Sequence, residues 1–226
     1  MELTDGNSII QYLEEFDDIS AVRQDALYIV KKSQGDDPDR MIEFKNAGFV
    51  FLDRLLCAEI NLKASYELRQ DRMKELPGLS FYDSSEFTKD MFDMACRQYT
   101  KDRRFHLKDC FDDVLAADII NIYSKHYMNC GGKLYLSNYN GALSGYIMYV
   151  QKGDSFENVL GVTAPGLPGK ASAYALYSKL MDKMLEEGYK NYKGWVSSSN
   201  IASINLHIKL GASVTRVIDE YIMRRK

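Results

Sequence analysis

One feature limits the fold more than any other: a change in hydrophobic period midway along the sequence. Apolar residues recur at helical spacing from Phe111 to Met128, and the residues that follow alternate as in strands. Two such strands, Gly132 to Leu136 and Ala142 to Val150, are separated by Asn140-Gly141, a dipeptide typical of two-residue hairpins. The second half of the chain is therefore predicted to contain an antiparallel hairpin preceded by helices.

The elements around this hairpin also alternate between strand and helix. A short strand, Leu79 to Tyr82, is followed by a helix from Asp83 or Ser84 to about Gln98. After the hairpin we expect, in order, a strand, a long helix, a strand, a helix and a last strand: Asn158 to Ala164, Lys170 to Glu187, Tyr189 to Val196, Asn200 to Lys209 and Val214 to Arg224. The order β-α-α-β-β-β-α-β-α-β indicates an α/β (α+β) module with antiparallel central strands.

Pro77-Gly78 divides the chain into an N-terminal region, 1–76, and a main domain, 77–226. The N-terminal region is predicted to contain a short amphipathic helix, a strand, a helix closed by Gly48 and a long strand: Ser8 to Phe16, Asp25 to Lys31, Arg40 to Asn46 and Phe49 to Lys63.

Two segments of the chain share one pattern. Residues 40–63 and 203–225 each run from a helix through lysine and glycine into a long strand with alternating apolar positions. We interpret the N-terminal region as a shortened copy of the C-terminal half. The alternative is a chance similarity between two helix–glycine–strand units.

Composition excludes several classes of protein. With 46% hydrophobic residues and a net charge of -3, the chain is not of the disordered type, and its acidic balance disfavours nucleic acid as a partner. The start, MELTDGNSII, does not resemble a signal peptide, and no apolar run is long enough to cross a membrane. Dispersed cysteines and three histidines predict a reduced, cytoplasmic protein with small buried thiols and no metal site.

The first chemical signal is the junction PGLPGKAS between a strand and the long helix. Gly166 and Gly169 allow tight turns, and the helix that follows points free N–H groups and the positive end of its dipole at the loop. Such a loop suits a pyrophosphate. It lacks the P-loop and GxGxxG patterns, which disfavours a nucleoside triphosphate or a dinucleotide.

The second signal is the helix that begins at Asn200. Helical spacing places Asn200, Ser203 and His207 near one face, in the segment NIASINLHIKLGA. The alternative interpretation is a plain amphipathic helix with Asn200 as its N-cap.

Together the two signals resemble the GNAT superfamily, the Gcn5-related N-acetyltransferases. The family's first motif, Q/R-x-x-G-x-G/A, corresponds to Gly166 to Ala171, and its second, N-x-x-A-x-x-L-Y-x-K-x-G-F, to Asn200 to Ala212. The sequence departs from the family at two positions. Gly166 stands where Gln or Arg is usual, and His207 stands where the family has Tyr.

The resemblance implies a mixed, mostly antiparallel sheet flanked by helices, with two central strands splayed apart to hold acetyl-CoA. It implies an acyltransferase in which an amine attacks the thioester directly. Backbone groups of Gly161, Val162, Thr163 and Ala164 would pair with the pantetheine, and Asn200 would hydrogen-bond it. The amides of Leu167, Gly169, Lys170, Ala171 and Ser172 would hold the pyrophosphate. His207 would protonate the leaving sulfur, although a buried histidine with an ordinary hydrogen bond remains the alternative.

A shortened half-module before a GNAT domain also resembles bacterial TDP-fucosamine acetyltransferases, which acetylate a 4-amino sugar carried on a nucleotide. This implies an acceptor site on the two helices before the hairpin, with these candidates: Arg104, Phe105, His106, Tyr123, His126 and Tyr127. The alternatives are an amino acid, peptide or polyamine acceptor, or a module that binds CoA without catalysis. We expect a monomer or homodimer that binds a small-molecule amine and neither nucleic acid nor membrane.

Overall fold

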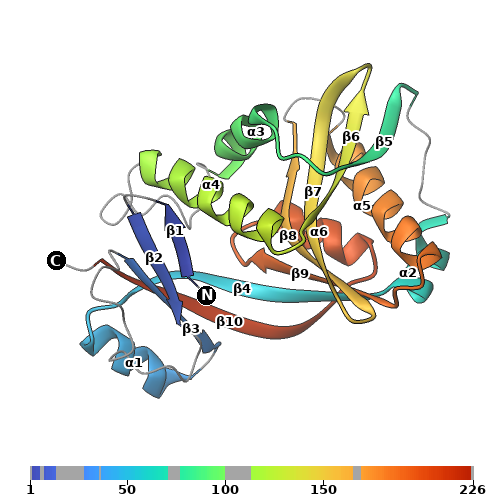
Figure 1. The fold of residues 1–226 in the computed structure, drawn as a ribbon. Coiled ribbons are helices and arrows are strands. Elements are labelled where there is room, and N and C mark those ends of the chain that lie inside the picture. Colours follow the sequence, from blue (N-terminus) through green and yellow to red (C-terminus); the bar gives the residue numbers. More distant parts are fainter. Residues whose placement is uncertain are drawn as a thin grey trace.

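The computed structural model describes residues 2–5, 8–13, 28–35, 37–70, 77–99, 113–164 and 169–224. In these residues ten strands form one sheet with the order β1-β2-β3-β10-β4-β9-β8-β7-β6-β5 (Figure 1). The strands are β1 Glu2–Asp5, β2 Ser8–Leu13, β3 Tyr28–Gln34, β4 Val50–Asn61, β5 Leu79–Ser84, β6 Lys133–Tyr139, β7 Ala142–Lys152, β8 Ser155–Thr163, β9 Asn191–Ser197 and β10 Ser213–Arg224. The helices are α1 Pro38–Asn46, α2 Leu62–Gln70, α3 Lys89–Tyr99, α4 Asp113–Asn129, α5 Gly169–Glu186 and α6 Ile201–Lys209.

The expected fold class is confirmed. The pairs β2–β3 and β8–β9 are parallel and the other neighbouring pairs are antiparallel. From β5 to β10 the element order is the predicted one. The hairpin turn between β6 and β7 has positive φ at Asn140 (50°) and Gly141 (84°), the conformation that an Asn-Gly hairpin requires.

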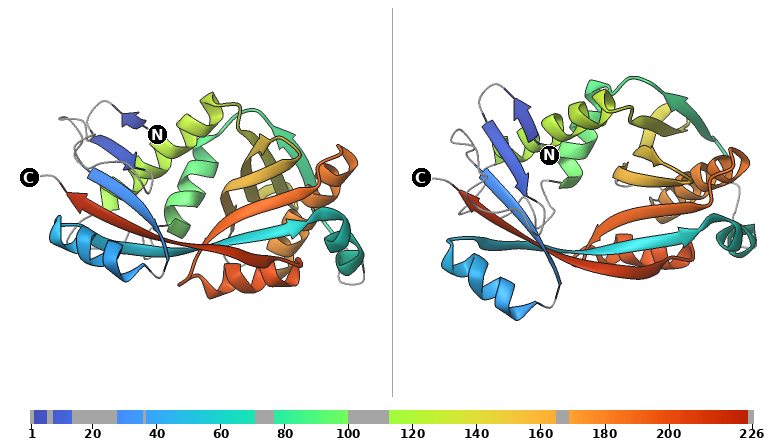
Figure 2. Two further views of the ribbon diagram at one scale, coloured as in Figure 1. Left: turned by 90° about the horizontal axis from the view of Figure 1, so that it is seen from below. Right: turned by 60° about the horizontal axis from the view of Figure 1, so that its bottom comes forward.

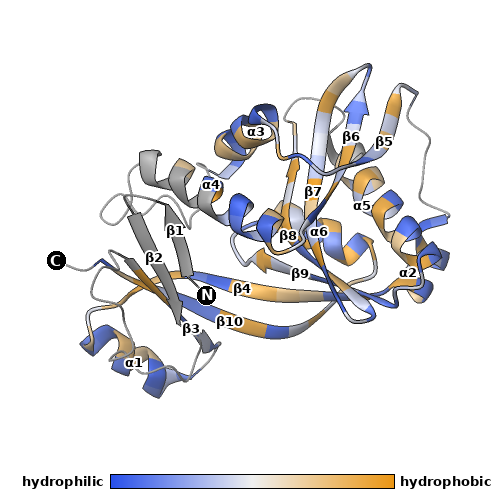
Figure 3. Ribbon diagram, viewed as in Figure 1, coloured by the Kyte–Doolittle hydropathy of each residue, from blue (hydrophilic) through white to orange (hydrophobic). Residues whose placement is uncertain are grey.

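Helices cover both faces of the main part of the sheet. Along β7, Ile147 and Tyr149 belong to the core under α5, whereas Tyr146 and Met148 belong to the core under α3 and α4. This strand is therefore buried on both sides, which explains why β7 is apolar along most of its length. Figure 3 shows the hydrophobic stretches on the central strands.

The N-terminal region corrects two expectations. The segment predicted as a helix from Ser8 is the strand β2, because β1 and β3 offer it partners on both sides and Ile9, Ile10 and Tyr12 suit a strand. The helix α2 was not predicted. The boundary proposed at residue 76 falls in segment 71–76, outside the described residues, and stays a prediction.

The long strand β4 lies inside the sheet, between β9 and β10, although it comes from the N-terminal region. Figure 2 shows β4 and β10 running side by side across the molecule. On the other side of β10 lies β3, so the central order is β3-β10-β4-β9. Strand β4 of the N-terminal region thus lies beside β9 and β10 of the C-terminal half, and β10 in turn lies beside β3 and β4.

Three consecutive elements of the N-terminal region recur at the end of the chain. Strand β3, helix α1 and strand β4 recur as β9, α6 and β10 with the same bounds shifted by 163 residues, from Tyr28 to Asn191 at their start. The registers obey the same relation. Leu55 pairs with Ile218, its own counterpart, and the pair Leu55–Ser197 repeats as Ile218–Gln34. Residues 28–61 are therefore a structural repeat of residues 191–224, related to them by a pseudo-twofold axis near Leu55 and Ile218.

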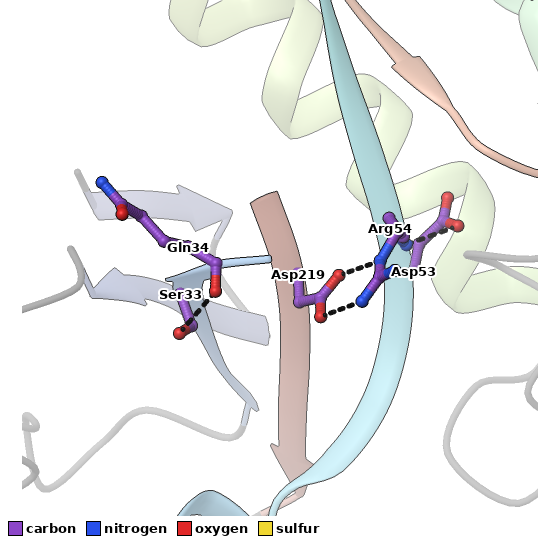
Figure 4. Close-up of polar contacts among 5 residues, drawn as sticks. All are labelled: Ser33, Gln34, Asp53, Arg54 and Asp219. Atoms are coloured by element: carbon purple, nitrogen blue, oxygen red, sulfur yellow. Dashed lines mark hydrogen bonds and ion pairs between the residues drawn. The ribbon is translucent and has the colours of Figure 1, made fainter. Parts of the chain in front are cut away.

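An ion pair joins β4 to β10 near this axis (Figure 4). Arg54 on β4 donates from Nε and Nη2 to the two carboxylate oxygens of Asp219 on β10, at 2.7 Å and 2.9 Å. The Asp219 side chain is only 8% exposed. A bidentate pair of this kind fixes the register of the two strands as well as their contact.

The structure also bears on the cysteines and on helices that could cross a membrane. Of the described cysteines, Cys57 is buried as expected, Cys96 is half-buried and Cys130 is exposed, because it lies just past the end of α4. Cys110 lies outside the described residues. Among the described helices, none combines the length and apolar character needed to cross a bilayer.

Candidate functional site

The two central parallel strands separate partway along their length. Strand β8 pairs with β9 only through four residue pairs, from Ser155–Asn191 to Asn158–Gly194. Beyond this point β8 stays paired with β7 up to Thr163, and β9 with β4 up to Ser197. We call residues 159–163 and 195–197 the β8–β9 split, and the pair Asn158–Gly194 its apex. Figure 1 shows the two strands diverging.

A bulge lies directly at the apex. Tyr149 of β7 pairs with Asn158, and the next residue, Met148, pairs with Leu160, so Val159 has no opposite residue on β7. A bulge bends the strand and increases its twist, which turns β8 away from β9. Of the predicted pantetheine-binding residues, Gly161, Val162 and Thr163 belong to β8 in the split and Ala164 follows it.

Helix α5 begins shortly after β8 ends. Its first turn contains Gly169, Lys170, Ala171 and Ser172 and no acidic residue. The backbone N–H groups of this turn have no partner within the helix, so the turn is suited to an anion. Leu167, the remaining predicted pyrophosphate residue, lies outside the described residues, as does Gly166.

Asn200 is the N-cap of α6. Its Oδ1 accepts a hydrogen bond from the Ser203 N–H at 3.0 Å. The cap uses only the side-chain oxygen, so the amide NH2 remains to donate to a ligand. Capping and ligand binding are thus compatible at this residue.

His207 is buried, with 2% of its surface exposed. Its Nδ1 lies 2.8 Å from the Ser203 carbonyl oxygen, and its Nε2 lies 2.7 Å from the Tyr192 hydroxyl. A carbonyl only accepts, so Nδ1 carries the proton and Nε2 accepts from Tyr192. Burial lowers the pKa of His207, which favours this neutral form.

Three polar residues at the apex were not identified from the sequence. Tyr177 of α5, Tyr192 of β9 and Asn158 of β8 have side chains that meet there. The Asn158 Nδ2 donates to the Tyr177 hydroxyl at 2.9 Å, and the rings of Tyr177 and Tyr192 pack edge to face with centroids 6.2 Å apart. The tyrosines are 94% and 100% buried. They occupy ordinary apolar positions of a helix and a strand, so no sequence pattern distinguished them from core residues.

The proposed acceptor residues are described only in part. Arg104, Phe105 and His106 lie outside the described residues. On α4, the Tyr123 hydroxyl donates to the Tyr127 hydroxyl at 3.4 Å, and the two rings pack edge to face with centroids 4.7 Å apart. His126 packs against Tyr127. The structure brings these three together, and nothing in it assigns them an acceptor.

Within the described ranges no three His, Cys, Asp or Glu side chains are grouped so as to hold an ion. The polar groups of the site are hydroxyls, amides, backbone N–H groups and the neutral imidazole of His207. Groups of this kind can orient a ligand and stabilise developing charge.

Comparison with known proteins was made by sequence and by structure. No protein-family model and no curated protein matches the sequence. A conserved protein of unknown function from Staphylococcus epidermidis has a similar structure, with a TM-score of 0.62 at 10% identity over 89% of this chain and 74% of that one.

Two further similar structures carry a family name. A tandem GNAT protein from the clavulanic acid biosynthesis pathway has a TM-score of 0.56 at 12% identity, over 88% of this chain and 65% of that one. A GCN5-related N-acetyltransferase from Sphaerobacter thermophilus has a TM-score of 0.52 at 9% identity, over 87% and 59%. The chain thus spans about three fifths to three quarters of these structures, and the likeness establishes the GNAT fold.

Proposed function

We propose that the protein is an N-acetyltransferase that moves an acetyl group from acetyl-CoA to a primary amine. The observation that carries this proposal is the β8–β9 split together with the N-terminus of α5. In the split the edge of β8 that faces β9 has no strand partner, and its Gly161 carbonyl and Thr163 N–H hydrogen-bond the side chains of Tyr99 and Gln98 instead. The first turn of α5 offers backbone N–H groups and contains no acidic residue. A long donor with an amide-containing arm and a pyrophosphate fits both features.

In the proposed reaction the backbone of Gly161 to Ala164 binds the pantetheine arm, and the first-turn amides of α5 bind the pyrophosphate. The neutral amine then attacks the thioester carbonyl carbon, and the C–S bond breaks to give an amide and a CoA thiol. The protein contributes position and fixed dipoles, which account for most of the rate in transfers of this kind.

For the acceptor we propose an amino sugar linked to a nucleotide, bound near α4. The support is the short N-terminal repeat, in which the sequence resembles enzymes that acetylate such sugars, and the aromatic group Tyr123, His126 and Tyr127 on α4. Aromatic rings stack on bases and sugars.

The test is to incubate the protein with acetyl-CoA and a panel of amines and to follow thiol release. The panel contains a TDP-linked 4-amino sugar, free amino acids, a peptide and a polyamine. Release with the amino sugar supports the full proposal, and release only with another amine replaces the acceptor. Tight CoA binding by calorimetry with no release from any amine would instead mean a binding module.

A substitution at Asn200 separates the two roles of that residue. Asn200→Ser keeps an N-cap oxygen but loses the amide donor, so we expect unfolding stability within about 0.5 kcal/mol of wild type and CoA binding weakened about three- to tenfold. Asn200→Ala, the control, loses both and should also cost about 1 kcal/mol of stability. Unchanged CoA affinity in both variants would remove Asn200 from the proposed site.

A further inference from the structure

The apex of the β8–β9 split brings together His207, Tyr192, Tyr177 and Asn158. Because the Ser203 carbonyl takes the Nδ1 proton of His207, the Tyr192 hydroxyl must donate to Nε2. The rings of Tyr192 and His207 both pack edge to face against the Tyr177 ring, with centroids 6.2 Å and 5.4 Å apart. Asn158 donates from Nδ2 to the Tyr177 hydroxyl at 2.9 Å.

One hydroxyl proton of this group has no acceptor in the described part of the chain. Tyr177 accepts from Asn158, and among the described residues no hydrogen bond uses the Tyr177 O–H as a donor. The Tyr177 side chain is 94% buried. Burying a hydroxyl whose donor is unused costs free energy, because the hydrogen bond that it loses to water is not replaced.

The Tyr177 hydroxyl lies against the wall of the split. An ideal Cβ on Gly161 would overlap the Tyr177 hydroxyl oxygen, so only glycine lets the phenol lie against β8 at this place. Gly161 is one of the residues proposed to bind the pantetheine arm, close to its thioester end at the apex. In the proposed binding mode the unused O–H therefore faces the thioester end of the arm.

The pseudo-twofold repeat argues that this polar group is not needed for packing. Shifted by 163 residues, Tyr192 corresponds to Ile29 and His207 to Phe44, both of which are buried, at 1% and 0% exposed. The apex residue Gly194 corresponds to Lys31, whose Nζ lies 4.8 Å from the centre of the Phe44 ring. The N-terminal repeat thus forms the same fold without a tyrosine, a histidine or a glycine at these three positions.

We propose that Tyr177 is the catalytic acid, donating its hydroxyl proton to the departing CoA sulfur, and that Asn158, Tyr192 and His207 position it. When the C–S bond breaks, its electron pair stays on sulfur and takes the Tyr177 proton, giving a thiol and a phenolate. The surplus proton on the acetylated nitrogen then restores the phenol through water. This inference rests on the proposed acetyl transfer, and it gives His207 a supporting place instead of the acid role expected from the sequence.

The test compares two tyrosines of the same core. Tyr177→Phe should lower kcat about 10- to 100-fold, with KM for acetyl-CoA and CoA affinity within about twofold of wild type, because the lost group acts on the leaving sulfur. The matched control is Tyr149→Phe, which removes another buried hydroxyl of that core, one with no hydrogen-bond partner among the described residues. Its kcat should stay within about twofold of wild type.

A double-mutant cycle tests the positioning residues. His207→Phe should lower kcat by a smaller factor than Tyr177→Phe does. His207→Gln can still accept from Tyr192 and should restore part of the lost kcat. The double variant Tyr177→Phe with His207→Phe should lose no more kcat than Tyr177→Phe alone. The inference is overturned if Tyr177→Phe keeps the kcat of Tyr149→Phe, or if His207→Phe alone abolishes turnover. If wild type releases no thiol with any amine, the proposed function fails instead.

Discussion

At the scale of single residues, His207 shows how one buried side chain couples stability to pH. Its pKa is held below the ordinary value of 6.5, first because burial disfavours the charged ring and against a smaller opposing effect of the hydrogen bond to Ser203. The unfolded chain therefore takes up a proton near pH 6.5 that the folded protein does not bind. The stability that His207 confers is complete above pH 6.5 and is lost as the pH falls through the folded pKa.

We therefore predict a steeper loss of stability on acidification in wild type than in His207→Gln. Below pH 6.5 the free energy of unfolding should fall more steeply in wild type, by up to about 1.4 kcal/mol per pH unit. Urea denaturation at pH 7.5, 6.5 and 5.5 measures this, with His126→Gln as the control. Parallel curves for wild type and His207→Gln would contradict it.

Sequence alone identified some residues of the site and could not identify others. Asn200 was found because the cap before a helix demands particular residue types. Tyr177 and Tyr192 were missed because their positions follow the ordinary apolar period of a helix and a strand. Their role depends on hydroxyls that meet across three elements, and such a meeting leaves no local pattern.

At the scale of elements, the Arg54–Asp219 pair joins β4 to β10. Removing the arginine leaves the Asp219 carboxylate largely buried without this cation. We predict that Arg54→Met lowers the free energy of unfolding by about 1–2 kcal/mol, measured by urea denaturation. Arg40→Met, which breaks the exposed Arg40–Glu43 pair on α1, should cost less than about 0.5 kcal/mol. Equal losses of unfolding free energy in the two variants would show that the Arg54–Asp219 pair contributes no more stability than a surface ion pair.

Local signals were sufficient for most elements and insufficient for one strand. The β6–β7 hairpin was predicted because its turn needs Asn-Gly and its strands alternate in polarity. In Ser8–Leu13 the apolar spacing also fits a helix, and only pairing with β1 and β3 decides in favour of a strand. Those partners are set by the whole sheet, so the segment itself could not reveal them.

At the scale of the whole molecule, the N-terminal region supplies the strand that separates β9 from β10. We predict that residues 77–226 expressed alone are insoluble or unfolded, since the exposed edges of β9 and β10 then lack β4. Co-expression with residues 1–76 as a second chain should restore soluble protein with the circular dichroism spectrum of the intact chain. A stable, monomeric fragment 77–226 would refute this.

The pseudo-twofold arrangement also sets the order in which the chain can fold. Both neighbours of β4, strands β9 and β10, are made at least about 130 residues after it. At ordinary translation speeds of about 5–20 residues per second, β4 therefore has no strand partner on either edge for on the order of ten seconds during synthesis. Its apolar stretch, Leu55 to Ile60, is then open to wrong partners, and pairings so distant along the chain form slowly. Nascent chains of this protein should therefore depend on chaperones until the last strand emerges.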